Sequence, residues 1–216
     1  MDTVTPKRER NKEQTQQRLI NATIELLKTD GFASLGINAI AAQAKVNKAL
    51  IYRYFDGLPG LMRAAANELD LTQTKLIDFS LPQTEGKIDL KEYLVEIFQS
   101  LHQNLQNDSL AQKLMIQELS EENEMTRTFA EAREQQGLEV TEQSKVLFSN
   151  LAGKEKMDAF DLQSALAITS AAIYYLTMRS TTVQMFNGVD IQSKEGWDRI
   201  CSTLATFFEK ALTSPV

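Results

Sequence analysis

The stretch INAIAAQAKVNKALIYRYF contains side chains with the chemistry to contact nucleic acid. Lys48 and Arg53 can donate hydrogen bonds to phosphates or to guanine edges, and Tyr52 offers a phenol to a phosphate. Ala49 and Leu50 could touch thymine methyl groups. These residue types, placed close together, suit a surface that contacts DNA, and the alternative is that Lys, Tyr and Arg on an exposed helix face are ordinary solvated residues.

Two short helices are expected to position these side chains. The first covers residues 37–44 and the second starts with Asn47 as N-cap, with Val46 filling the turn between them. The side chains expected to face the core are Ile37, Ile40, Ala41 and Ala44 of the first helix and Leu50, Ile51, Tyr54 and Phe55 of the second. The small Ala41 and Ala44 allow the helices to cross closely.

Two longer helices are predicted on either side of this pair. Apolar residues recur at helical spacing over residues 11–29, and Gly31 stands where a left-handed cap ends a helix. Phe32 is placed to fold back onto the last turn of this helix. A further helix is expected from about Leu58 towards Phe79, with Pro59 tolerated in its first turn.

Residues 11–63 resemble the DNA-binding domain of the TetR family of bacterial transcriptional regulators. The family pattern I-A-x-x-A-G-V-S-x-x-x-L-Y-x-Y-F is represented here by Ile40, Ala41, Ala44, Lys45, Val46, Asn47, Ile51, Tyr52, Tyr54 and Phe55. The resemblance implies that Asn38, Lys48, Ala49 and Leu50 lie near base edges. It places Tyr52 at a phosphate, with Lys45, Asn47 and Arg53 as further DNA-binding candidates.

Three positions depart from the family pattern. Lys45 replaces the usual glycine of the turn, so we expect this lysine to hold a positive φ, with an ammonium that can reach a phosphate. Gly36 replaces the usual capping Thr, which leaves only its backbone N–H to meet a phosphate. Leu58 replaces a frequent phosphate-binding lysine. We therefore expect a weaker grip on the DNA backbone than most family members have.

The distribution of charge also separates the N-terminal part from the rest. Residues 1–63 contain 10 Lys and Arg against 6 Asp and Glu, whereas residues 64–216 contain 13 against 23, although the whole chain has a net charge of −6. A basic unit on an acidic body suits a protein that holds phosphates with one end only.

The rest of the chain is predicted to be helical. Few prolines occur, no segment alternates like a strand, and helices are expected at 88–106, 108–119, 121–152, 158–187 and 193–212. Asn187 and Gly188 are expected to end the fourth of these helices, and Ser193 to cap the last. We predict an all-α fold, with a DNA-binding domain at residues 1–57 and a ligand-binding and dimerisation domain at 58–216.

In the TetR family the C-terminal helices form a ligand chamber and a two-fold dimer face. By analogy, helices 158–187 and 193–212 are expected to form a homodimer interface. The side chains considered for an effector site are His102, Tyr174, Tyr175, Met178 and Arg179. Plain core packing is the alternative for the aromatic and Met residues, an ion pair for Arg179, and an ordinary helix position for His102.

Other functional classes find little support in the sequence. No nucleotide-binding, hydrolase or metalloprotease motif occurs, and one histidine with one cysteine, Cys201, leaves few nucleophile and base pairs. No Cys/His spacing suggests a zinc site and no cofactor is predicted. Without a long apolar segment or a secretory signal, we expect a cytoplasmic protein that does not cross a membrane.

These observations favour a sequence-specific DNA-binding transcriptional regulator. The leading hypothesis is a ligand-responsive repressor that binds a palindromic double-stranded DNA operator as a homodimer and responds to an unidentified small-molecule effector. The alternative is a helical protein-interaction module that retains a helix-turn-helix without binding DNA.

Overall fold

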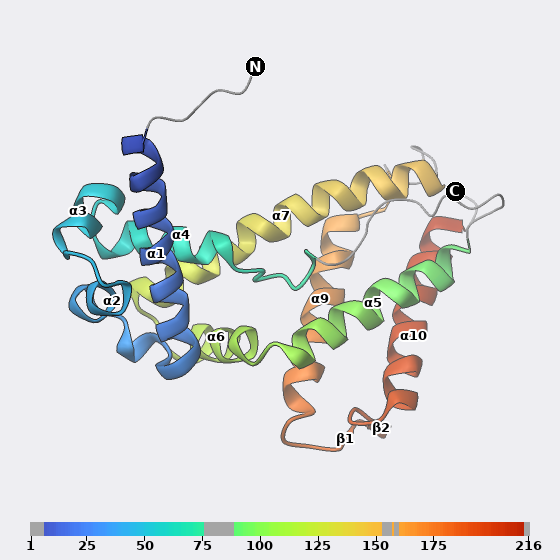
Figure 1. Cartoon of the computed structure of the whole chain (residues 1–216). Helices are drawn as coiled ribbons and strands as arrows, with labels where there is room; N and C mark the ends of the chain where they lie inside the picture. Colours follow the sequence, from blue (N-terminus) through green and yellow to red (C-terminus); the bar gives the residue numbers. More distant parts are fainter. Residues whose placement is uncertain (1–6, 76–88, 153–156, 158–159, 214–216) are drawn as a thin grey trace. The chain divides into compact units, whose positions relative to one another are not determined.

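The structure is a computed structural model that describes residues 7–75, 89–152, 157 and 160–213 (Figure 1). Helices make up nearly all the regular structure of these residues, and the strands among them form one short hairpin. The predicted all-α fold class is confirmed.

The chain forms two compact units, which are described separately below. Unit 1 comprises Met1–Leu71 and Lys113–Gln135, and unit 2 comprises Thr72–Gln112 and Gln136–Val216. These units are defined by packing, whereas the predicted domains at 1–57 and 58–216 are divisions by function. The functional boundary therefore stays a prediction.

Unit 1 contains the predicted helix pair and its flanking helices. In chain order these are α1 (Lys7–Asp30), the 3-10 helix η1 (Phe32–Ser34), α2 (Ile37–Ala44), α3 (Ala49–Phe55) and α4 (Leu58–Glu68) (Figure 1). Helix α1 packs against α2 and α4, and α3 packs against α4. Their fully buried side chains include Leu19, Leu27, Ile40, Ile51, Leu61 and Met62. Helix α3 is therefore supported from behind by an apolar core.

Gly31 ends α1 with a positive φ as expected, but its ψ of −162° lies outside the left-handed helical region that we predicted for the cap. Gly31 has a φ of 69°, and its N–H donates to the carbonyl of Leu27 at 3.1 Å. Phe32 is buried, with its ring edge-on to Phe129 at a centroid distance of 5.1 Å. The positive φ of Gly31 thus turns the chain into the core of unit 1, where Phe32 packs against Phe129.

Helix α4 is shorter than predicted. Pro59 lies in its first turn as expected, but the helix ends at Glu68, and Leu69 is extended with φ −82° and ψ 149°. Leu71 is 1% exposed, and its carbonyl accepts a hydrogen bond from Arg133. Arg133 is distant in sequence from Leu71, so helical periodicity could not indicate this contact or the early end of α4. The predicted end near Phe79 lies outside the described residues.

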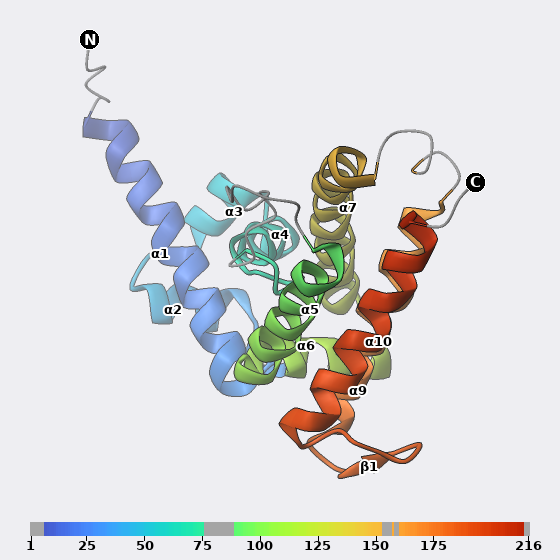
Figure 2. The same cartoon turned by 90° about the vertical axis from the view of Figure 1, so that its right-hand side faces the viewer.

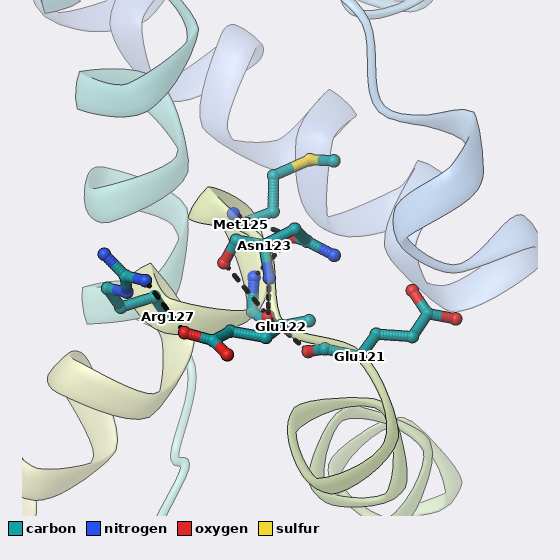
Figure 3. A network of polar contacts seen from close by, with 6 residues as sticks. Glu121, Glu122, Asn123, Met125 and Arg127 are labelled. Carbon is teal, nitrogen blue, oxygen red and sulfur yellow. Dashed lines mark hydrogen bonds and ion pairs between the residues drawn. The ribbon is translucent and has the colours of Figure 1, made fainter.

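Helices α6 (Ser109–Ser120) and α7 (Glu124–Ala152) are joined by a capped turn (Figure 3). Asn123 Oδ1 accepts from the N–H groups of Met125 at 2.9 Å and Thr126 at 3.0 Å. Thr126 Oγ1 in return accepts from the N–H of Asn123 and donates to the carbonyl of Glu121. This reciprocal cap fixes the start of α7.

Unit 2 is built on α5 (Leu90–Asn107), α9 (Leu162–Arg179) and α10 (Lys194–Thr213), and α5 packs against both of the others (Figure 2). Its buried apolar cluster is Leu94, Phe98, Leu101, Phe148, Leu162, Ile173, Trp197, Cys201, Ala205, Phe208 and Leu212. Helices α5, α6 and α7 lie within a few residues of the predicted segments.

The predicted helix 158–187 is wrong over its last eight residues, 180–187. Helix α9 ends at Arg179, and a hairpin follows, with β1 (Met185–Phe186) antiparallel to β2 (Val189–Asp190). Asn187 and Gly188 have φ values of 47° and 80° and form the hairpin turn, which suits an Asn-Gly pair. They turn a hairpin instead of ending a helix.

The start of α10 is as predicted. Ser193 Oγ accepts from the N–H of Gly196 at 3.0 Å, as an N-cap does. Trp197 and Phe208 of this helix are buried, whereas Phe207 is 64% exposed.

Candidate nucleic-acid interface

The turn between α2 and α3 is closed by a Schellman motif. Lys45 is left-handed, with φ 54° and ψ 48°, and its N–H donates to Ala42 while the N–H of Val46 donates to Ala41. The expectation of a positive φ at Lys45 is confirmed. A lysine therefore occupies a backbone conformation that favours glycine.

Arg18 of α1 supports the same turn. Its guanidinium donates to the carbonyl of Ala44 and, at 3.2 Å, to that of Lys45. These carbonyls lie at the end of α2, where backbone carbonyls have no hydrogen-bond donor within the helix. The sequence does not indicate this contact, because an arginine on the polar side of an amphipathic helix gives no sign of a distant partner.

Helix α3 begins as predicted, with Asn47 as its cap. Asn47 Oδ1 accepts from the N–H of Ala49 at 2.9 Å, and its carbonyl accepts from Leu50 at 3.0 Å. The far end of α3 is fixed by Gly60, because a Cβ there would lie 1.8 Å from the carbonyl oxygen of Phe55. Only glycine lets α4 cross this end of α3 so closely.

The two faces of the helix pair differ as the pattern predicts. Ile40, Ala41, Ala44 and Ile51 are buried, whereas Val46, Leu50, Tyr54 and Phe55 are half-buried. The exposed residues of the predicted DNA-binding set are Asn38, Lys45, Asn47, Lys48, Ala49, Tyr52 and Arg53, and Gly36 is half-buried. The fold thus gathers most of the predicted residues on the outer side of α2 and α3.

The outer side is positively charged and locally ordered. Lys48 Nζ donates to Asn38 Oδ1 at 3.4 Å, which links the first turns of the two helices. Arg53 lies 5.8 Å from the ring centroid of Tyr54, and Tyr52 is 59% exposed. No Asp or Glu occurs in the sequence between Asp30 and Asp56. Such a surface can attract phosphates and donate to base edges.

Gly36 precedes α2 with an extended backbone, φ −147° and ψ 151°, and no side-chain hydrogen bond caps the helix there. Leu58, at the start of α4, is half-buried. Neither position adds a polar side chain to the surface, as expected from the sequence.

The residues considered for an effector site lie in different environments of unit 2. His102 is buried, with its ring stacked on Trp197 at 3.5 Å and Nδ1 3.0 Å from Thr177 Oγ1. Burial lowers the pKa of His102 to about 4. These two partners lie on α9 and α10, so the local sequence around His102 could not indicate them.

The other members of this set make contacts of their own. The hydroxyl of Tyr174 donates to the carbonyl of Thr72 at 2.7 Å, whereas Tyr175 is 50% exposed and lies edge-on to Phe186. Met178 is half-buried. Arg179 Nη1 donates to Thr182 at 3.5 Å, and its Nε is buried without a hydrogen-bond partner.

The part of the chain that the structure describes contains no group of three or more His, Cys, Asp or Glu side chains able to hold a metal ion. Its helices also include none with the length and apolar character needed to cross a membrane. Cys201 is buried, and burial raises the pKa of its thiol to about 12.

The fold and this surface define a class: an all-helical protein with an N-terminal helix-turn-helix. Residues 19–65 match the model of a family described as bacterial regulatory proteins, tetR family. Over these residues the chain is therefore similar to the tetR family, in agreement with the motif resemblance. No curated protein matches the sequence significantly.

Several solved structures share the fold over most of the chain. GusR of Salmonella enterica is 18% identical, with 93% of this chain and 96% of that chain aligned and a TM-score of 0.58. SCO7518 of Streptomyces coelicolor A3(2), described as a candidate transcriptional regulator, is 18% identical over 93% and 99%, with a TM-score of 0.53. HlyIIR, a hemolysin II transcriptional regulator, is 19% identical over 90% and 98%, with a TM-score of 0.50.

Proposed function

We propose that this protein is a sequence-specific DNA-binding transcriptional regulator. The observation that carries the proposal is the outer face of α3, where Lys48, Tyr52 and Arg53 are exposed together while Ile51 is fully buried behind them. A short helix that is held from behind and cationic in front fits the major groove. The match of residues 19–65 to a family of regulatory proteins supports this function.

We further propose that the protein acts as a homodimer on a palindromic operator. Helix α9 exposes a stripe of small and apolar side chains, Ala167, Ile168, Ala171 and Tyr175, and α10 exposes Phe207. Ile168 is 69% exposed and Phe207 64%, so covering them with a second copy would remove apolar surface from water. A two-fold dimer matches a DNA site made of two inverted half-sites.

A ligand-responsive repressor in the cytoplasm is the form of this function that we favour. SCO7518 and HlyIIR carry the names of transcriptional regulators. Repression is what the resemblance of residues 11–63 to the TetR family favours. For an effector, the buried pair of His102 and Thr177 offers polar atoms within an otherwise apolar cluster. An effector that binds unit 2 would change the affinity for the operator only if it prefers one DNA-binding state.

The test is DNA binding by a variant that loses a single hydroxyl. Fluorescence anisotropy on the DNA upstream of the protein's own gene should show affinity falling on the order of 100-fold between 50 and 200 mM salt. Tyr52→Phe should weaken binding about tenfold by removing a donor to a charged phosphate. Tyr54→Phe is the matched control, because Tyr54 is the half-buried neighbour, and it should bind normally.

Circular dichroism and sedimentation should show both variants folded and in the same oligomeric state as the unaltered chain. If DNA binding were absent, or insensitive to salt and to Tyr52→Phe, the helix-turn-helix would serve packing alone. The protein-interaction module would then be the better account.

A further inference from the structure

The first turns of α2 and α3 form a corner that presents hydrogen-bond donors to the outside. We call Asn38, Asn47 and Lys48 the donor corner. The oxygen of Asn38 already accepts from Lys48 Nζ at 3.4 Å, and the oxygen of Asn47 already accepts from the N–H of Ala49 at 2.9 Å. Among the residues that the structure describes, both amides therefore have their NH2 groups free, next to the remaining N–H groups of the Lys48 ammonium.

The segment that carries the donor corner contains no carboxylate. The sequence has no carboxylate between Asp30 and Asp56, and the residue beside Lys48 on the exposed face is Ala49, which offers only a methyl group. All three residues of the donor corner are exposed, so their donors are open to a ligand. The corner is suited to a partner that presents acceptors.

The four bases differ in what they present in the major groove. Guanine offers two adjacent acceptors, N7 and O6, whereas adenine pairs an acceptor with an N6 donor and cytosine offers an N4 donor. Thymine offers one acceptor beside a methyl group. Two neighbouring donors are matched fully only by guanine, and an adenine or cytosine would bring a donor against a donor.

We propose that the donor corner selects a G·C base pair in each operator half-site, with Lys48 and Asn38 donating to guanine N7 and O6. This inference rests on the proposed function and specifies which base the site reads. Lysine contact to guanine needs no rearrangement of the turn, since the Lys48–Asn38 hydrogen bond already holds the two donors side by side.

The first experiment uses the unaltered full chain. Selection from random duplexes should give a consensus that contains a guanine in each half-site. Replacing that guanine with 7-deazaguanine removes the N7 acceptor and should weaken binding about tenfold. Inosine keeps both major-groove acceptors and loses only the minor-groove amine, so it is the matched control and should bind like guanine.

The second experiment identifies the protein side of the contact. Lys48→Met keeps the length of the side chain and removes its donors, so the preference for G·C over A·T at that position should fall about tenfold. Lys45→Met is the control, because Lys45 is an exposed cation of the same turn that lies outside the donor corner. It should weaken both duplexes equally.

The outcomes separate this inference from the function on which it rests. If no duplex is enriched, the chain is not a sequence-specific DNA binder and both proposals fail. If a consensus appears but lacks the guanine, tolerates 7-deazaguanine, or keeps its G·C preference in Lys48→Met, the donor corner holds a phosphate. The proposed function as a DNA-binding regulator would then hold, and the proposed contact to guanine would be refuted.

Discussion

Lys45 has a backbone conformation that lowers the stability of the fold and a charge that suits DNA binding. Its left-handed conformation, φ 54° and ψ 48°, costs an ordinary residue about 1–2 kcal/mol relative to glycine. The side chain is exposed and makes no hydrogen bond to any residue that the structure describes, so folding gains little from it. The lysine at this position is better explained by binding of its ammonium group to DNA than by a contribution to the stability of the turn.

Lys45→Gly should therefore stabilise the protein by about 1 kcal/mol and weaken its DNA binding. Lys45→Ala is the control, because alanine removes the same charge but keeps the Cβ that makes the conformation costly. Urea unfolding and anisotropy of both variants check this. Loss of stability in Lys45→Gly would mean that the lysine side chain supports the fold.

His102 is neutral in the folded protein because burial lowers its pKa to about 4 from 6.5. Its ring stacks on Trp197, and Nδ1 lies 3.0 Å from the hydroxyl of Thr177. Between pH 6.5 and 4 the unfolded chain takes up a proton that the folded chain does not. The free energy of unfolding must fall as the pH falls through this range.

We expect the unaltered chain to lose on the order of 2 kcal/mol more unfolding free energy between pH 7 and pH 4.5 than His102→Gln, which has no imidazole to protonate. Urea unfolding at the two pH values measures the difference, and the comparison cancels the titration of the carboxylates. Equal pH dependence of the two proteins would show that His102 is accessible to protons in the folded state.

At the scale of elements, a buried ion pair joins α6, α7 and the segment after α4 within unit 1. Arg133 Nη2 and Nε donate to the two carboxylate oxygens of Glu118 at 2.9 and 3.2 Å, and Nη1 donates to the carbonyl of Leu71. The two side chains are 11% and 12% exposed. Removing one partner would leave the other charge buried and unpaired.

Arg133→Met should destabilise the protein by about 3 kcal/mol, and adding Glu118→Leu should recover at least half of that loss, since a buried apolar pair can replace a buried ion pair. Arg127→Met breaks the exposed pair with Glu122 and should change stability by less than about 0.5 kcal/mol. Urea unfolding provides all three values. A small effect of Arg133→Met would show that water reaches the pair.

The elements of the helix-turn-helix could be predicted because their signals are local. Apolar spacing located α2, Asn47 marked the start of α3, and the family pattern explained the positive φ of Lys45. The segment after Arg179 could not be read in this way, because its apolar residues also fit a helix. Its hairpin depends on Ile191, which is fully buried and accepts from the indole N–H of Trp197.

The DNA-binding set and the effector set differ in the same way: the first depends on local signals and the second on contacts between distant residues. The DNA-binding set lies within 18 consecutive positions, Gly36 to Arg53, so helix geometry alone places it on one side. The effector set combines His102 of α5 with residues of α9, and its neighbours are decided by packing between helices. Sequence spacing contains no information on that packing, which is why Thr177 and Trp197 were missed.

At the scale of the whole molecule, the N-terminal part of the sequence and the rest of the chain carry net charges of opposite sign. Residues 1–63 carry more Lys and Arg than Asp and Glu, and residues 64–216 carry the opposite excess. The donor corner and Tyr52 lie in the basic part, and the exposed apolar side chains of α9 and α10 lie in the acidic part. DNA binding and self-association would thus use different surfaces.

The most direct test of the central claim is a footprint of the purified, unaltered chain on the DNA upstream of its own gene. A dimer that inserts two copies of α3 should protect two inverted half-sites whose centres lie about 34 Å apart, one turn of the double helix, or a multiple of that spacing. Absence of protection, or protection of a single site without two-fold symmetry, would contradict the account.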